Sequence, residues 1–123
     1  MKLEVFDVSH GFCAYLIADN GNVMLFDCGH NEDTGFRPSA YLPATGCTRI
    51  ENFIIQNFDQ DHISDLPSLR QQLPITQFIR NRSVSVGQLR ALKKETGYVT
   101  GAMEAVLDMH DNYIYSLPNP PIF

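Results

Sequence analysis

The first part of the chain alternates apolar and polar residues with a period of two, which predicts β-strands. Leu3 and Val5 alternate with charged side chains, and two apolar runs follow at 13–17 and 23–26. Asn20-Gly21 lies between these two runs. An Asn-Gly pair favours a tight hairpin turn, because both central residues of that turn need positive φ. We therefore expect an antiparallel meander at the start of the chain.

The pattern changes beyond the meander. Residues 28–51 are rich in Gly, Pro, Asn and Thr and predict a long surface loop with at most a short helix near 36–42. The elements expected after this loop are a strand at 53–56 covered on both faces, a helix at 66–73 capped by Asp65, a strand at 75–80, and helical residues 85–109 interrupted at Gly97 and Gly101. The prolines of 117–123 indicate a linker-like end. This order of elements predicts an α/β fold.

Composition limits the classes of function. A chain of 123 residues with 44% hydrophobic residues fits a single domain. Its formal net charge of -5 argues against a protein that holds nucleic acid through bulk electrostatics, since such proteins gather Lys and Arg on one surface. One cluster of basic residues favours a solvated helix face, and the alternative for it is a small nucleic-acid patch. The cluster consists of Arg80, Arg82, Arg90, Lys93 and Lys94.

Cysteine spacing and the start of the chain bear on the cellular compartment. Cys13, Cys28 and Cys47 are odd in number and show no CxxC spacing, so neither a disulfide framework nor a thiolate zinc site is predicted. The start MKLEVFDVSH lacks the unbroken apolar stretch of a signal peptide. No run approaches the roughly 18 apolar residues of a membrane span. We expect free thiols in a cytoplasmic protein that does not enter a membrane.

The candidate chemistry lies in the sequence NFDQDH at 57–62, directly after an apolar run. If this segment is extended, alternate side chains share a face, so that Asn57, Asp59 and Asp61 converge and His62 follows at the turn into the next helix. Two carboxylates, an amide oxygen and an imidazole suit Mn, Mg or Fe, and are less selective for Zn. The alternative is local capping, in which Asp61 and Asp65 stabilise helix starts and His62 is a satisfied boundary histidine.

Three segments resemble one known family in order and spacing. IIQNFDQDHISDL resembles the H-x-H-x-D-H signature of the metallo-β-lactamase fold superfamily, and it is more similar to the H-x-D-x-D-H of the branch around the bacterial DNA-uptake competence protein. FDVSHGFCAYLI resembles the opening of that branch, D-V-G-Q-G-D-(A/S)-x-L-I. NGNVMLFDCG resembles its hairpin, N-G-x-x-x-L-I-D-x-G. The resemblance covers residues 6–66, about half of the chain.

The resemblance implies a fold and two alternative functions. The expected fold is the first half of a metallo-β-lactamase-like αββα sandwich, a mixed sheet with an N-terminal antiparallel meander and outer helices, in a single incomplete domain. The implied function is a metal-dependent hydrolase that acts on phosphodiester or other phosphate ester bonds. The alternative is a degenerate, non-catalytic domain of this fold that serves binding or assembly.

Site residues follow from the resemblance position by position. Asp59 falls on the second ligand position, and Asp61 and His62 fall on the D-H pair. Asp61 is therefore the expected catalytic residue, as a metal ligand that also orients the nucleophilic water. Asp27 matches the aspartate that closes the hairpin. Asn57 replaces the first histidine, and an amide is a poorer ligand than an imidazole.

Further expectations concern the surroundings of the site. His30 and His10 are candidates to line it, although an ordinary loop position explains them equally well. The implied cofactor is a divalent metal, Mn, Zn, Mg or Fe, and the implied substrate is a small-molecule or nucleic-acid phosphoester. In the resembled family the inner face of the sheet is buried against a second half. We therefore expect a homodimer, a partner chain or a missing C-terminal half to cover it.

Overall fold

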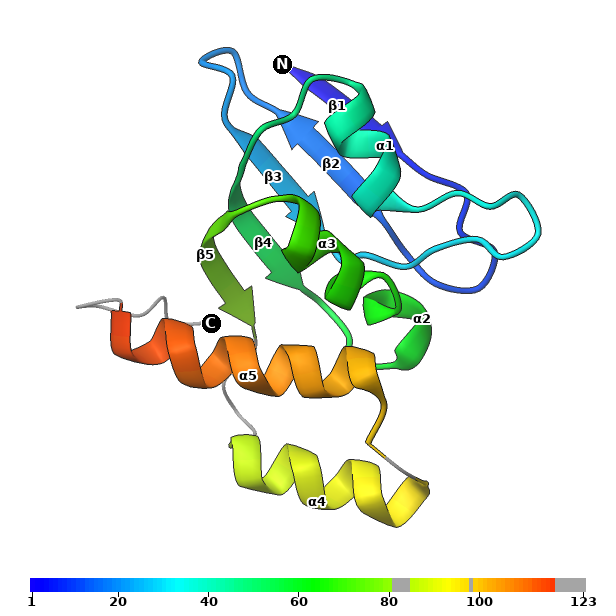
Figure 1. The fold of residues 1–123 in the computed structure, drawn as a ribbon, viewed down its shortest axis with the longest axis vertical. Coiled ribbons are helices and arrows are strands. Elements are labelled where there is room, and N and C mark those ends of the chain that lie inside the picture. Colours follow the sequence, from blue (N-terminus) through cyan, green and yellow to red (C-terminus); the bar gives the residue numbers. More distant parts are fainter. Residues whose placement is uncertain (81–84, 98, 117–123) are drawn as a thin grey trace.

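The apolar runs of the sequence form the strands of one mixed sheet in the computed structural model, which describes residues 1–80, 85–97 and 99–116 (Figure 1). The elements along the chain are β1 (Lys2–Val5), β2 (Ala14–Ile17), β3 (Val23–Phe26), α1 (Pro38–Ala44), β4 (Ile50–Ile55), α2 (Gln60–Ile63), α3 (Leu66–Gln72), β5 (Ile75–Arg80), α4 (Val86–Thr96) and α5 (Gly101–Ser116). The chain is thus an α/β protein. The linker-like end predicted at 117–123 lies outside the described residues.

The five strands lie in the order β1-β2-β3-β4-β5. The pairs β1/β2 and β2/β3 are antiparallel, whereas β3/β4 and β4/β5 are parallel. The expected meander is therefore confirmed, and its second turn lies at Asn20-Gly21, where Gly21 has φ of 87°. A parallel pair needs a helical crossover, and α1 and then α2 with α3 supply the two crossovers.

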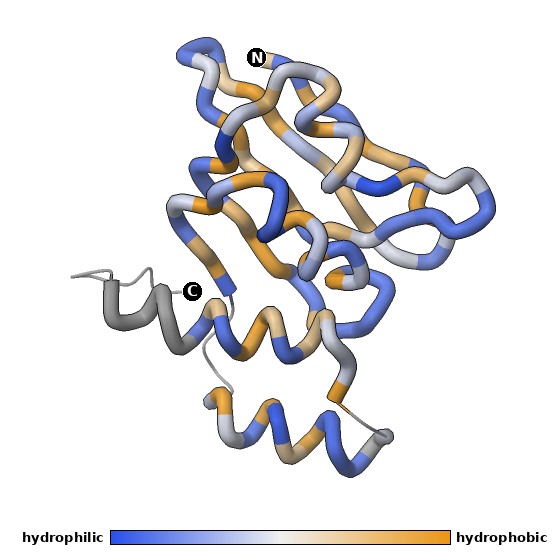
Figure 2. Tube along the Cα trace, in the orientation of Figure 1, coloured by the Kyte–Doolittle hydropathy of each residue, from blue (hydrophilic) through white to orange (hydrophobic). Residues whose placement is uncertain are grey.

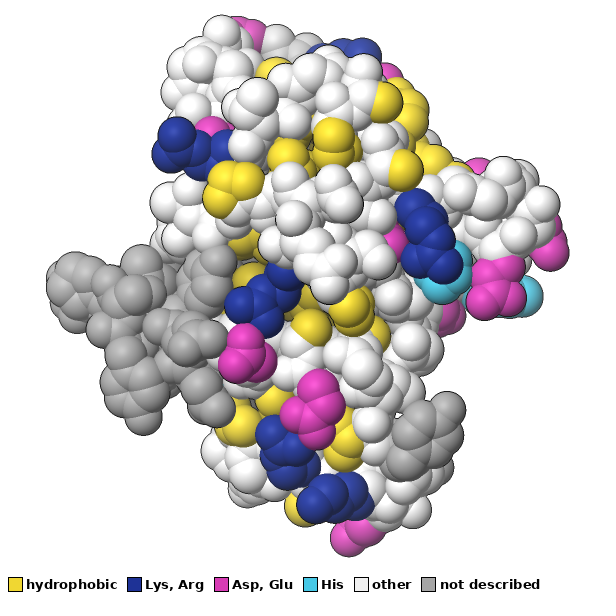
Figure 3. All heavy atoms as spheres, viewed as in Figure 1, with side chains coloured by type: hydrophobic (Ala, Val, Ile, Leu, Met, Phe, Trp, Pro, Cys, Tyr) yellow, Lys and Arg dark blue, Asp and Glu magenta, His cyan; other side chains and the backbone are white. Residues whose placement is uncertain are grey.

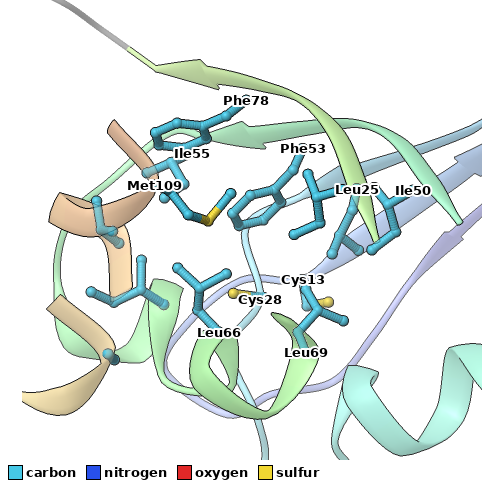
Figure 4. Close-up of a cluster of buried hydrophobic side chains, with 14 of the residues drawn as sticks. Cys13, Leu25, Cys28, Ile50, Phe53, Ile55, Leu66, Leu69, Phe78 and Met109 are labelled. Carbon is cyan, nitrogen blue, oxygen red and sulfur yellow. The ribbon is translucent and has the colours of Figure 1, made fainter. Parts of the chain in front are cut away.

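The hydrophobic core lies between the sheet and the helices. Tyr15, Leu25, Phe53 and Phe78 are paired positions of β2 to β5 and therefore share one face of the sheet. Figure 4 shows Phe53 facing Leu66 and Leu69 of α3, with Met109 of α5 beside it; these four side chains are almost fully buried. Each such side chain contributes about 1.5–3 kcal/mol through burial. This core fixes α3, and with it the chain that enters it from α2.

The opposite face of the sheet is also apolar, although the helices pack on the first face. Its paired positions carry no charge, and they are Leu3, Val5, Ala14, Leu16, Met24, Phe26, Asn52, Ile54, Gln77 and Ile79. Most of its large apolar side chains are half-buried, and those on β1 are exposed. Figure 2 shows the hydrophobic colouring along the central strands, in contrast to the hydrophilic turn between β2 and β3.

Several boundaries differ from the predicted ones. The strand expected at 53–56 begins at Ile50, because Ile50 pairs with Ile75 and is fully buried despite its polar neighbours. The short helix expected near 36–42 occupies Pro38–Ala44. α2 was not predicted, since a helix of one turn carries too few positions to show a period. The predicted interruption at 97–101 is confirmed, and α5 continues beyond 109 to Ser116.

The prediction that Asp65 caps the helix at 66–73 is wrong. Asp65 occupies the capping position of α3, but its side chain makes no capping hydrogen bond there. Its fully buried carboxylate instead accepts hydrogen bonds from the Ser39 N–H (2.7 Å) and Oγ (3.1 Å) and from Arg37 Nη1 (3.0 Å). The carboxylate therefore satisfies the first turn of α1, and it ties that helix to α3.

The interpretation of the basic residues as one helix face is also wrong. Arg80 belongs to β5 and is buried, with its guanidinium carbon 5.8 Å from the centre of the Phe58 ring. Arg82 lies outside the described residues. Arg90 and Lys93 do lie on α4, where Arg90 pairs with Glu104 of α5. Among the described helices, none is both long and apolar enough to cross a membrane.

Candidate functional site

The site is built around a contact between Asp27 and His62 at the carboxyl ends of β3 and β4. Asp27 directly follows β3 and has φ of 56°, a left-handed conformation that Asp adopts more readily than most residues. One carboxylate oxygen accepts from the Gln56 N–H at 2.8 Å, and the other lies 2.7 Å from His62 Nδ1. Asp27 is completely buried. The strand ends thus hold one carboxylate in a fixed orientation toward one imidazole.

The electrostatics of this contact fix the His62 ring. Burial raises the pKa of the Asp27 carboxyl above its ordinary value, and the hydrogen bonds from His62 and from the Gln56 N–H oppose that rise. When Asp27 is ionised, its carboxylate only accepts hydrogen bonds, and Nδ1 then carries the ring proton in this contact. In the neutral imidazole Nε2 then keeps its lone pair. That nitrogen lies 3.8 Å from an oxygen of Asp61.

Two glycines determine where Asp61 lies. A side-chain carbon at Gly11 would lie 1.7 Å from the Asp61 carbonyl oxygen, and one at Gly29 would lie 2.2 Å from it. The backbone is further tied by hydrogen bonds from the Cys28 N–H to the His62 carbonyl (2.8 Å) and from the Gly29 N–H to the Phe12 carbonyl (3.0 Å). The loops after β1 and β3 therefore close on the backbone of α2 from both sides.

An open groove of about 620 Å³ lies beside this corner. Asp59, Asp61, His10 and His30 all line it, together with Val8, Ser9, Asn31, Glu32, Asp33, Gln60 and Ser64. In Figure 3 histidine and acidic side chains gather at the right edge of the molecule, where Figure 1 places the loops after β1 and β3. The groove thus brings together four of the residues predicted from the sequence, and its lining is rich in carboxylates.

His30 is held by Ser64 rather than lying free in its loop. Ser64 Oγ accepts from the His30 N–H at 3.1 Å and lies 2.5 Å from His30 Nδ1, so one hydroxyl contacts both the backbone and the ring of His30. His30 Nε2 is buried and lies 3.6 Å from a carboxylate oxygen of Glu32. His10, by contrast, is exposed at the rim. Of the two histidines, only His30 has an orientation fixed by neighbouring groups.

The expected convergence of Asn57, Asp59 and Asp61 is not observed. β4 ends at Ile55, and Asp61 already lies in the first turn of α2, so the segment is not extended and the alternation argument fails. Asn57 Oδ1 accepts from the Asp59 N–H at 2.8 Å in a local turn. The Asp59 carboxylate is 70% exposed and lies 3.7 Å from Lys93 Nζ. The structure thus keeps Asp61 and His62 together and turns the other two side chains to other partners.

The side chains at this corner can be compared with the ligands that the implied metal ion would need. Asp61 and His62 would hold the ion, and Asp27 would support the imidazole from behind, as carboxylates commonly do for metal-binding histidines. In the described ranges 1–80, 85–97 and 99–116, no group of three or more His, Cys, Asp or Glu residues is placed to hold a metal. Two protein ligands fit an ion that keeps most of its positions for water or substrate, as Mg or Mn does.

Sequence patterns alone did not identify several residues of this site. Ser64 orients His30, although neither the local pattern nor the resemblance assigned it that role, and Glu32 lies 3.6 Å from the same ring. Gly11 matters only because the Asp61 backbone comes close to it, and that approach is a tertiary contact. Asp27 was found through the resemblance and not through any local pattern. A comparison of the chain with protein-family models and with curated proteins found no match.

Proposed function

We propose that the corner of Asp61 and His62 binds a divalent metal ion, in a domain that descends from metal-dependent hydrolases of the metallo-β-lactamase fold. The observation that carries the proposal is the contact between Asp27 and His62 Nδ1 (2.7 Å). It leaves Nε2 as the free ligand atom, on the side of Asp61. The three sequence segments that resemble the family also support a metal site here, since they supply Asp27, Gly29 two residues later, and the D-H pair.

The proposed substrates are phosphate esters, among them phosphodiesters. A bound ion would lower the pKa of a coordinated water toward neutrality. The chain's own residues would hold the imidazole through Asp27 and keep Asp61 at the groove through the two close glycines. His30, fixed by Ser64, lines the groove beside Asp61. Further ligands would have to come from another segment or another chain.

The second candidate is a non-catalytic domain that keeps this fold for binding or assembly. It is favoured by the side chain of Asn57, which stands at the first ligand position of the motif and is engaged with the Asp59 N–H. It is also favoured by Asp59, whose carboxylate lies near Lys93 rather than near His62. In this case the corner binds metal weakly or not at all, and the groove has another ligand.

Titration calorimetry with Mn²⁺ and Zn²⁺ tests the proposal, with Asp61→Asn as the variant and Asp59→Asn as its matched control. We expect metal binding that Asp61→Asn weakens about 10-fold or more and that Asp59→Asn leaves nearly unchanged. Hydrolysis of bis-p-nitrophenyl phosphate, measured with the same metals, separates the two candidates. Binding without hydrolysis favours the non-catalytic domain. The absence of binding, or equal binding by both variants, contradicts the proposed site.

A further inference from the structure

The edge strand β1 exposes apolar side chains that most edge strands avoid. Met1, Leu3 and Val5 are exposed by 83%, 61% and 63%, and together they form most of the exposed large hydrophobic side chains of the described residues. β1 stands at the end of the strand order, so none of the described strands pairs with its outer side. An apolar edge of this kind is a template for a further strand.

The backbone of β1 offers hydrogen-bonding groups on that outer side. The Phe6 N–H donates to the Cys13 carbonyl at 2.9 Å, and this bond continues the antiparallel register in which Val5 opposes Ala14. Hydrogen-bonded and non-hydrogen-bonded pairs alternate along such a ladder. The N–H and C=O groups of Leu3 and Val5 therefore point away from β2. A second strand can bond to both residues.

Charge complementarity selects the identity and the register of that strand. In an antiparallel pairing of two β1 strands centred on Leu3, the two Leu3 residues oppose each other, and Lys2 of each copy opposes Glu4 of the other. These Lys-Glu positions are non-hydrogen-bonded pairs, in which side chains come closest. A register centred on Glu4 would instead place two carboxylates face to face. We propose that two copies of this chain pair antiparallel through β1, centred on Leu3.

Lys2 and Glu4 of the single chain already form the kind of ion pair that the dimer would form between the two copies. Lys2 Nζ lies 3.0 Å from a Glu4 oxygen of the same strand, on the face that carries no exposed apolar residue. In the dimer each lysine finds the glutamate of the other copy as well, and the exposed Leu3 side chains cover each other. The pairing is symmetric, as expected for an isologous dimer. It extends the sheet in its own plane, beyond β1.

Light scattering coupled to size exclusion, over a range of protein concentrations, tests the proposal. We expect a dimer for the native sequence. Glu4→Lys places lysines opposite lysines, and Lys2→Glu places glutamates opposite glutamates. Each change should raise the dimer dissociation constant about 10-fold or more. An equimolar mixture of the two variants should form a heterodimer, because every charged pair is then opposite in sign again.

Formation of the heterodimer would show that the charge changes act on the interface and not on the fold. This check is needed because Glu4→Lys also removes the hydrogen bond from Tyr41 Oη to Glu4 (2.8 Å), whereas Lys2→Glu keeps it. Leu3→Thr should weaken the dimer as well, and Leu92→Thr on α4, which is 51% exposed, is the matched control that should not. A native chain that stays monomeric at every concentration overturns the proposal. A dimer unaffected by Leu3→Thr, or two charge variants that do not associate with each other, overturns it too.

Discussion

The buried carboxylate of Asp27 lies 2.7 Å from Nδ1 of His62, and this contact decides which nitrogen of the imidazole is available. Asp27→Asn keeps the shape and an oxygen that can accept from the Gln56 N–H. The amide NH₂ can however donate to Nδ1, which moves the ring proton to Nε2. We expect the variant to fold and to bind Mn²⁺ about 10–100-fold more weakly than the native chain.

The tautomer can be observed directly through the ¹⁵N chemical shifts of His62 in the native chain and in Asp27→Asn. The thermal unfolding midpoint serves as the control for folding. Asp27→Ala is a less informative variant, because it also leaves the Gln56 N–H without its acceptor. A folded Asp27→Asn protein with native metal affinity would mean that Asp27 does not act through the His62 ring.

A second prediction concerns the two glycines that lie against the backbone of α2. Gly11→Ala or Gly29→Ala would place a carbon within 1.7 Å or 2.2 Å of the Asp61 carbonyl oxygen, so the loops have to move apart. We expect each change to lower the free energy of unfolding by more than about 3 kcal/mol. Urea unfolding measures this loss.

Gly87→Ala is the matched control for these two changes. Gly87 lies in α4, and a carbon added to it meets nothing within 4 Å. Alanine is the better helix former, so the control should raise stability by about 0.5–1 kcal/mol. If the Gly11→Ala variant were as stable as the Gly87→Ala variant, the loop after β1 would not lie close to the Asp61 backbone.

Local patterns predicted the fold better than they predicted the site. The meander and its turn at Asn20-Gly21 depend on neighbouring residues, and they form as expected. The proposed convergence of Asn57 with Asp59 and Asp61 assumed that the chain stays extended beyond β4. One turn of helix begins at Gln60 instead, so the alternation of an extended chain ends before Asp61. Such a short helix has no period that a sequence pattern can show.

The role of Asp65 also depends on tertiary contacts that local sequence patterns do not show. Its sequence position, before an apolar run, is that of a helix cap, and the residue does stand at the start of α3. Its hydrogen-bond partners, Ser39 and Arg37, are more than 20 residues away along the chain. A carboxylate takes the donors that the packing of helices brings to it, and the packing of α1 against α3 is not visible in the sequence.

This buried carboxylate leads to a third prediction. Asp65→Ala leaves the Ser39 N–H and hydroxyl without their acceptor inside the protein, and we expect a loss of about 2–4 kcal/mol in the free energy of unfolding. Asp108→Ala is the control, because it removes an exposed ion pair with Arg70 and should change stability by less than about 1 kcal/mol. Equal effects of the two changes in urea unfolding would contradict the assigned role of Asp65.

The last prediction concerns the uncharged face of the sheet that the helices do not cover. Phe26 and Ile54 are paired positions in the middle of this face, and both are only half-buried. Pairing through β1 would extend the sheet in its plane and would leave this face open. We therefore expect the folded chain to bind the dye ANS, and the double variant Phe26→Thr/Ile54→Thr to lose most of that fluorescence while it keeps strand-forming residues. Leu92→Thr should leave the fluorescence unchanged. A folded native chain that binds no dye would contradict an open face and would show that another layer covers it. In that case mild denaturant should release the layer and expose the dye-binding site before the sheet unfolds.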